Sequence, residues 1–237
     1  MITSKLFIST LCFCVFSINL NAETVQFFGT ATDLKTGKFL YTDNHKENWV
    51  NGKHVSSDIE YKNSSGKAFA KKTISFAKNS ELAEFKLEDF RDGYIEGAKI
   101  NGKEVTLFFK KNSSEELQEK TFPIPTNAVA DGGFDYFVRN NWDYLDKGNK
   151  KTFQMFAPSQ QDNFKFLVKK INRKEFNDED YLNLKLELDS IIGVFLPSIN
   201  LTYSRKTRRI ANYEGISNIN NEKGKSYFVK LIYDQFK

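Results

Sequence analysis

The stretch from Asp131 to Gly148, DGGFDYFVRNNWDYLDKG, decides how the rest of the chain is expected to fold. Its large apolar residues recur with the 3.6-residue period of a helix, which predicts one amphipathic helix over 131–147. The apolar stripe consists of Phe134, Phe137, Val138, Trp142 and Leu145. Asp131 is expected to cap the start, because its carboxylate can accept from free backbone N–H groups. Gly148 suits the left-handed residue that ends a helix.

A helix of this length is marginal alone in water, so its apolar stripe must pack against a larger surface. The flanking sequence supplies strands. Before the helix, turn signals separate aromatic and β-branched runs, and Asn51-Gly52 is the strongest hairpin signal. The hairpin places Trp49 opposite His54. We therefore expect an antiparallel meander over Thr24–Lys110.

After the helix the strand pattern resumes. Leu182, Leu184, Leu186 and Leu188 alternate with polar residues, which predicts a strand with one buried and one wet face. The final strand, 226–236, carries Tyr227, Val229, Leu231 and Tyr233 on one face. The predicted fold class is mainly β: a curved antiparallel sheet or incomplete β-barrel wrapped around one central amphipathic helix.

Residues 1–22 read as a signal peptide, with Lys5 ahead of an uncharged apolar run and Ala22 before the expected cleavage site. The apolar run is shorter than the roughly 20 residues that span a bilayer, which disfavours an uncleaved anchor. Residues 23–237 then form a single β-rich domain of 215 residues (237 − 22 = 215), and the expected location is periplasmic or secreted. No stretch of this domain is apolar enough for a transmembrane segment.

The composition excludes several kinds of chemistry. Both cysteines, Cys12 and Cys14, lie in the leader, so the mature chain has no thiol for catalysis or metal binding. Its net charge of +4 (+5 − 1, because Lys5 is lost) is small and spread out, which does not favour nucleic acid. His45 and His54 are expected about 13 Å apart on a wet sheet face, too far to share a metal. We expect no metal and no cofactor.

Catalytic signatures are weak. The chain has no G-x-S-x-G elbow, P-loop or G-x-G-x-x-G motif. Asp131 and Asp135 share one helix face, but capping explains the first, so an acid-pair hydrolase is the weakest reading. Arg139 and Asp143 are expected to form an exposed i,i+4 pair, with a ligand mouth as the sharper alternative. No catalytic residue is assigned, and a non-enzymatic role is favoured.

Aromatic residues make up 15% of the chain, and 23 residues are phenylalanine. This excess indicates either an unusually aromatic filled core or a cavity lined by rings. If there is a groove between sheet and helix, its floor is expected to include Phe134, Phe137, Trp142 and Leu145. The apolar segment Ile191–Leu196, with Ile191 and Phe195 as candidates, is expected to act as a lid.

Three stretches together resemble an uncharacterised family of secreted bacterial proteins: Gly133–Arg139 with Trp142-Asp143, Leu201–Tyr203 with Arg208, and Tyr213–Ile219. That resemblance implies an extracytoplasmic location more than a function. The layout is also distantly similar to the half-barrel of lipoprotein carriers (LolA-like), in which a curved sheet wraps a helix and shelters acyl chains. No ligand-binding motif of that fold is matched.

These observations favour a periplasmic, non-enzymatic binding protein that carries a lipid or other hydrophobic small molecule in a groove between sheet and helix. The alternative is an envelope structural or protein-interaction module with a filled core and no ligand. The first reading implies a hydrophobic small molecule as partner, and the second an envelope protein.

Overall fold

The computed structural model describes residues 21–189 and 198–234, and within them one sheet dominates, antiparallel except for its last pair of strands. Its spatial order is β8-β7-β6-β5-β4-β3-β2-β1-β15-β14-β13-β12-β11-β10-β9. The first eight strands are β1 (Ala22–Asp33), β2 (Phe39–Val50), β3 (Lys53–Lys62), β4 (Ala68–Ser75), β5 (Glu84–Asp89), β6 (Tyr94–Asn101), β7 (Glu104–Lys110) and β8 (Gln118–Pro123). The others are β9 (Ala128–Val129), β10 (Lys151–Ala157), β11 (Asp162–Lys170), β12 (Tyr181–Leu188), β13 (Ile199–Ser204), β14 (Ile210–Asn220) and β15 (Ser226–Asp234).

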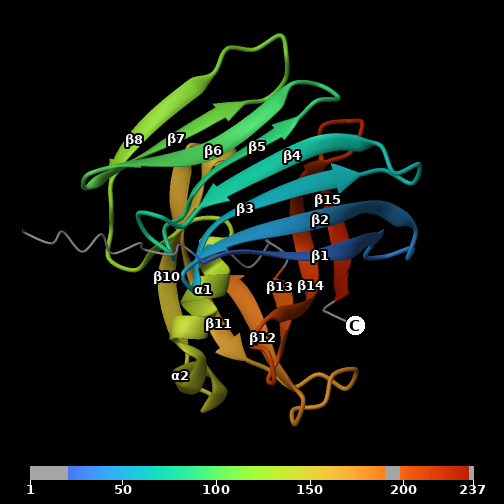
Figure 1. Cartoon of the computed structure of the whole chain (residues 1–237), viewed down its shortest axis with the longest axis vertical. Helices are drawn as coiled ribbons and strands as arrows, with labels where there is room; N and C mark the ends of the chain where they lie inside the picture. Colours follow the sequence, from blue (N-terminus) through green and yellow to red (C-terminus); the bar gives the residue numbers. More distant parts are fainter. Residues whose placement is uncertain (1–20, 190–197, 235–237) are drawn as a thin grey trace, which may run out of the picture.

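The two meanders, β1–β8 and β10–β15, join where β1 pairs antiparallel with β15. In Figure 1 the blue-to-green strands cross the upper half, and the yellow-to-red strands run from behind them into the lower half. The sheet is open at β8 and β9, yet it curls until side chains of the two margins meet. Lys120 Nζ donates to the carbonyl of Gln161 at 3.1 Å, and the rings of Phe122 and Phe156 lie 6.0 Å apart. The predicted mainly β, barrel-like fold is therefore confirmed at this level.

Local sequence explains the hairpins. Asn51 and Gly52 adopt positive φ angles of 51° and 72°, as a type I′ turn requires, and Trp49 pairs with His54 as predicted. Buried residues alternate along β12 and β15, with Leu182, Leu184 and Val229 fully enclosed. The wet-face prediction fails at one position, because Asn183 is also fully buried and bonds to Thr202 Oγ1 at 3.0 Å.

The single helix predicted over 131–147 is not observed. Two short helices replace it, α1 (Gly133–Asn140) and α2 (Trp142–Asp146), so the structure does not confirm one central helix. The break lies at Asn141, whose backbone leaves the helical region and whose side-chain amide donates to the Phe137 carbonyl at 2.8 Å. That side chain competes with the helical hydrogen-bond ladder, as asparagine commonly does.

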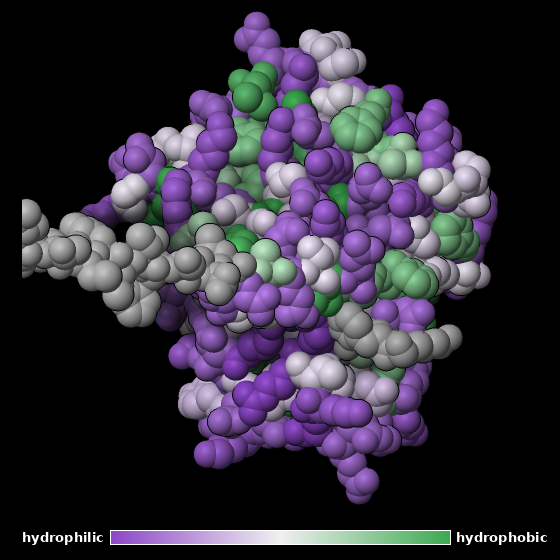
Figure 2. All heavy atoms as spheres, in the orientation of Figure 1, coloured by the Kyte–Doolittle hydropathy of each residue, from purple (hydrophilic) through white to green (hydrophobic). Residues whose placement is uncertain are grey.

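The packing forms two hydrophobic clusters. The first lies mainly among β1–β7 and reaches Phe156, Ile219, Val229 and Leu231 of the other half. The second joins α1 and α2 to β9–β13. The face in Figure 2 is mainly hydrophilic, with separate hydrophobic spots among polar side chains. None of the helices in the described ranges combines the length and apolarity that crossing a bilayer requires.

Candidate functional site

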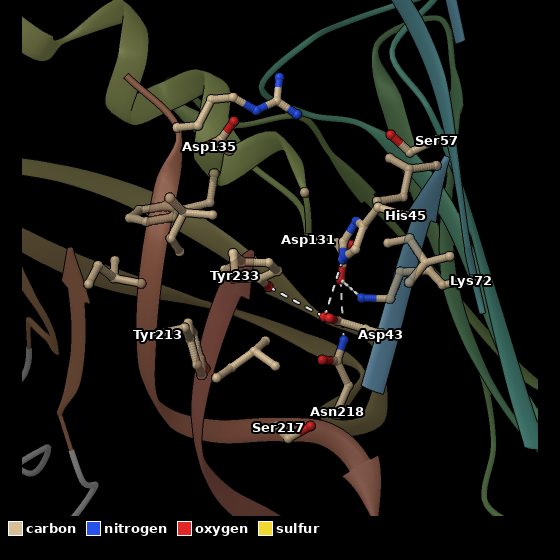
Figure 3. Close-up of a pocket in the computed structure, with 18 of the residues that line it drawn as sticks. Asp43, His45, Ser57, Lys72, Asp131, Asp135, Tyr213, Ser217, Asn218 and Tyr233 are labelled. Carbon is tan, nitrogen blue, oxygen red and sulfur yellow. Dashed lines mark hydrogen bonds and ion pairs between the residues drawn. The ribbon is translucent and has the colours of Figure 1, made fainter. Parts of the chain in front are cut away.

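A pocket of about 350 Å³ lies between the two halves of the sheet and the start of α1. Strands β1–β4 supply one wall and β12–β15 the other. The apolar lining includes Ile59, Ile74, Phe76, Phe134, Leu201, Tyr203, Ile210, Val229 and Leu231. Its volume is at the lower end of the range for small-molecule sites. Charged and tyrosine side chains interrupt this apolar lining, and Figure 3 shows several of them directed toward one another.

Lys72 and Asp131 form a buried ion pair at one side of the pocket. Lys72 Nζ lies 2.7 Å from Asp131 Oδ1, and the side chains are only 7% and 9% exposed. Asn218 Nδ2 donates to the same oxygen at 3.2 Å. Burial lowers the pKa of Lys72, but the charge of Asp131 outweighs it and holds that pKa above its ordinary value. Lys72 is therefore a fixed cation and not an amine nucleophile.

The predicted capping role of Asp131 is wrong. Gly132 occupies the N-cap of α1 and no side chain caps it, whereas Asp131 adopts a positive φ of 42° and directs its carboxylate to Lys72. A buried lysine requires a partner more strongly than a helix start requires a cap, since an unpaired buried charge costs several kcal/mol. Asp131 thus links the start of α1 to β4.

Two further ion pairs lie on another side of the pocket. Arg139 Nη2 is 2.5 Å from Asp135 Oδ2 one turn earlier on α1, and Arg209 Nη2 is 2.5 Å from Glu47 Oε1. Burial raises the pKa of the Asp135 carboxyl, while Arg139 acts in the opposite direction. The expected pair of Arg139 with Asp143 is not formed, because the break at Asn141 separates the two helices. Arg139 lines the pocket instead.

His54 is buried, which contradicts the prediction of a wet sheet face. Its ring stacks on Trp49 at a centroid distance of 4.9 Å, and Nδ1 lies 3.1 Å from the Tyr136 hydroxyl. Burial lowers its pKa, so the ring is neutral at pH 7. Nε2 faces both the Ser56 carbonyl at 3.0 Å and Ser57 Oγ at 2.9 Å. The carbonyl can only accept, so a proton on Nε2 satisfies that contact and makes His54 a poor base toward Ser57.

His45 also lines the pocket, and its side chain is 15% exposed. Its ring stacks on Phe27 at 4.5 Å, and Nε2 lies 3.2 Å from Asp43 Oδ2. Asp43 itself is 4% exposed. Its Oδ2 accepts a long hydrogen bond from the Tyr233 hydroxyl at 3.4 Å, and its Oδ1 has no hydrogen-bond partner among the described residues. This carboxylate is the least satisfied acid of the pocket.

Gly29 makes the position of Asp43 possible. It pairs in register with Asp43 on one side and with Tyr233 on the other. A Cβ at Gly29 would lie 2.3 Å from Asp43 Oδ1 and 2.9 Å from the Tyr233 ring. The missing side chain therefore lets the carboxylate and the phenol ring approach each other above β1.

The residues predicted from the sequence to form the groove lie in different places in the structure. Phe134 lines the pocket. Phe137, Trp142 and Leu145 lie in the second hydrophobic cluster, where Phe137 and Trp142 contact the rings of Phe153 and Tyr203. Ile191 and Phe195 lie outside the described residues. Within residues 21–189 and 198–234, no group of three or more histidine, cysteine or acidic residues is placed to hold a metal.

Sequence reasoning missed most of the polar lining. Lys72 and Asn218 carry no motif, and Glu47, Arg209 and Asp43 are spread over both halves of the chain. One signal was available: the successive odd positions of β2 from Tyr41 to Glu47 share one face, and all of them carry polar groups.

Comparisons with known proteins identify no family. No family profile matches the sequence, and no curated protein matches it. Among solved structures, the chain is similar to a β-barrel-like protein of domain of unknown function DUF1849 from Brucella abortus, with a TM-score of 0.47 and 10% identity. That similarity covers 93% of this chain and all of the other.

Proposed function

We propose that this protein is a non-enzymatic binding protein that holds a hydrophobic or amphiphilic small molecule, such as a lipid, in the pocket between the two halves of the sheet. The observation that carries the proposal is the pocket itself. A space of about 350 Å³, enclosed by aromatic and aliphatic side chains from β1–β4, α1 and β12–β15, is what an apolar ligand of modest size requires.

The polar groups of the pocket favour binding over catalysis. Lys72 is held as a cation by Asp131, and His54 is held by the Ser56 carbonyl and Tyr136. The acids Asp135 and Glu47 are each paired with an arginine. An activated nucleophile needs an adjacent base that can take its proton, and none of these pairs supplies one. Fixed, paired groups orient a ligand without transforming it.

The extracytoplasmic location belongs to the same proposal. It rests on the leader-like pattern of residues 1–22 and on the confinement of both cysteines to it. The likeness to the lipoprotein-carrier half-barrel likewise remains a prediction from the sequence. A binding protein exported to the periplasm would meet lipids and other apolar molecules that need shelter from water.

The first experiment is native mass spectrometry of the mature protein purified from its own periplasm, followed by organic extraction. We expect additional mass that leaves with solvent. Binding is then measured with the uncharged fluorophore N-phenyl-1-naphthylamine. Met155→Trp places a bulky indole ring at the pocket wall and is expected to abolish binding of the fluorophore. Ile232→Trp, an exposed position on β15, is the matched control and is expected to keep it.

The outcomes separate clearly. A bare mass together with no fluorophore binding to the wild-type protein would reject the proposal. Equal binding by wild type, Met155→Trp and Ile232→Trp would show that the fluorophore sits elsewhere. Near-ultraviolet circular dichroism confirms that each variant is folded before binding is compared.

The second candidate is a protein-interaction module of the envelope. It is supported by exposed apolar side chains on the joined strands β1 and β15 and at the start of β2: Phe28, Phe39, Phe228 and Ile232 are 37–53% exposed. A pull-down from cross-linked envelope tests it, with Phe228→Ser and Ile232→Ser expected to release the captured partner. The pocket does not favour the filled core that this candidate assumes.

A further inference from the structure

The charges around the pocket are not balanced. Among the described residues, seven aspartate, glutamate, lysine and arginine side chains line it: the acids Asp43, Glu47, Asp131 and Asp135, and the cations Lys72, Arg139 and Arg209. Each of the three cations is already within 2.7 Å of an acid. The fourth acid, Asp43, is the one whose nearest basic group is a histidine ring, His45 at 3.2 Å.

Asp43 is surrounded by aromatic rings. Figure 3 shows its carboxylate directed toward Tyr233, between β2 and β15. Tyr41, Tyr61 and Tyr213 line the same pocket, and the rings of Tyr41 and Tyr61 meet edge to face at 5.7 Å. Burial raises the pKa values of Tyr41, Tyr61 and Tyr233, and the negative charge of Asp43 adds to the increase in each. The carboxylate therefore acts on Tyr41, Tyr61 and Tyr233, whereas burial raises the pKa values of Tyr61 and Tyr213 and the charge of Lys72 acts on them in the opposite direction.

An acid inside a group of aromatic rings is suited to an organic cation. The ring faces attract a cation through their quadrupoles, and the carboxylate supplies the opposite charge. A quaternary ammonium group also makes no hydrogen bond, so it does not require the Asp43 oxygen that is packed against Gly29. A carboxylate head would instead be repelled by Asp43, and the three cations of the pocket are already paired with the other acids.

We infer that the pocket selects amphiphiles with a positively charged, amine-type head over anionic ones, and that Asp43 provides the selectivity. This inference rests on the proposed function, because it assigns a head-group class to the ligand of the same pocket. The apolar lining near Ile59, Val229 and Leu231 receives the chain, and the cluster formed by Asp43 and Tyr41, Tyr61, Tyr213 and Tyr233 receives the head.

The test compares three ligands with one chain length: decyltrimethylammonium, decanol and decanoate, each titrated calorimetrically at pH 7 below its micelle concentration. We expect the ammonium compound to bind at least about tenfold more tightly than decanoate, as an effect of one nearby acid that has no lysine or arginine partner. Asp43→Asn should remove that preference. Asp58→Asn, an exposed acid on β3 outside the pocket, is the matched control and should behave as wild type.

The result that overturns the inference is equal or tighter binding of decanoate by wild type, with the proposed function intact because ligands still bind. An ammonium preference retained in Asp43→Asn would overturn the role of Asp43. If none of the three compounds binds, the proposed function fails together with the inference. The wild-type comparison does not depend on whether Asp43→Asn folds. Of the three ligands, only the ammonium compound should bind more weakly at raised salt. Salt screens the attraction between its charge and Asp43 but does not weaken the burial of its alkyl chain.

Discussion

Lys72 Nζ on β4 lies 2.7 Å from Asp131 Oδ1 at the start of α1, and fifty-nine residues separate them in the chain. The two side chains are more than nine-tenths buried. The contact fixes the helix start against the first meander and closes one side of the pocket. It also explains the left-handed backbone of Asp131, which a helix cap would not require.

Lys72→Met is expected to lower the free energy of unfolding by about 3–5 kcal/mol, because it leaves the buried Asp131 charge without its cationic partner. Urea unfolding at pH 7 measures it. Lys71→Met is the neighbouring control, since its pair with Asp58 is exposed at 3.9 Å and should contribute under about 1 kcal/mol. The double variant Lys72→Met, Asp131→Asn should lose less stability than the sum of the losses measured for the two single variants. A loss below 1 kcal/mol for Lys72→Met would contradict this account.

Trp142→Ala is expected to cost about 3–5 kcal/mol, as large aromatic truncations in cores do. Trp142 is 5% exposed and meets the Tyr203 ring edge to face at 6.2 Å. Tyr144→Ala, two residues further along α2 and 49% exposed, should change stability by less than about 1 kcal/mol. Equal losses in the two variants would show that α2 does not pack its predicted apolar stripe into the core.

Gly29→Ala is expected to destabilise by about 1–3 kcal/mol through overpacking, because the new methyl group meets Asp43 Oδ1 and the Tyr233 ring. Gly132→Ala is the comparison. Its nearest neighbour is the flexible end of Ile74 at 2.8 Å, which can move, so the change should stay within about 1 kcal/mol. Thermal unfolding measures the stability of both variants. A larger loss of stability for Gly132→Ala than for Gly29→Ala would contradict the proposed crowding at Gly29.

Asp146 is expected to make stability depend on acid pH. Arg205 first, through hydrogen bonds of 2.6 and 2.8 Å, and then Lys170 hold its pKa well below the ordinary 3.8. A lowered folded-state pKa contributes stability at pH values above 3.8 that is lost as the pH falls toward the folded value. Asp146→Asn should therefore be less stable than wild type at pH 6, with the difference shrinking below pH 3.8. Asp143→Asn, 81% exposed, should show no such difference.

Much of the fold was predictable from the sequence because its signals are local. The Asn51-Gly52 turn determines which residues face each other across the β2–β3 hairpin, and the alternation in β12 and β15 determines which residues are buried. The helical period correctly identified Phe137, Val138, Trp142 and Leu145 as buried. It did not predict the break at Asn141, since the period of apolar residues continues across that position.

The candidate site was much less predictable. Of the described groove candidates, only Phe134 lines the pocket, because the others fill the interface between the helices and β9–β13. His45 and His54 were expected to face water because only their position in the hairpin was known. His54 is buried and His45 is partly buried, because α1 and β14–β15, distant in the sequence, cover that face of β2 and β3.

The sequence by itself determined the strands, their hairpins, the apolar stripe of the helical region and the cysteine-free domain, because each depends on residue type and spacing within a few positions. Only the tertiary structure decided the pocket and its charges. Curling of the sheet brings Lys72 to Asp131, Glu47 to Arg209 and Asp43 to Tyr233 across 59, 162 and 190 residues. No local pattern encodes such pairings, since they depend on how the two meanders join along β1 and β15.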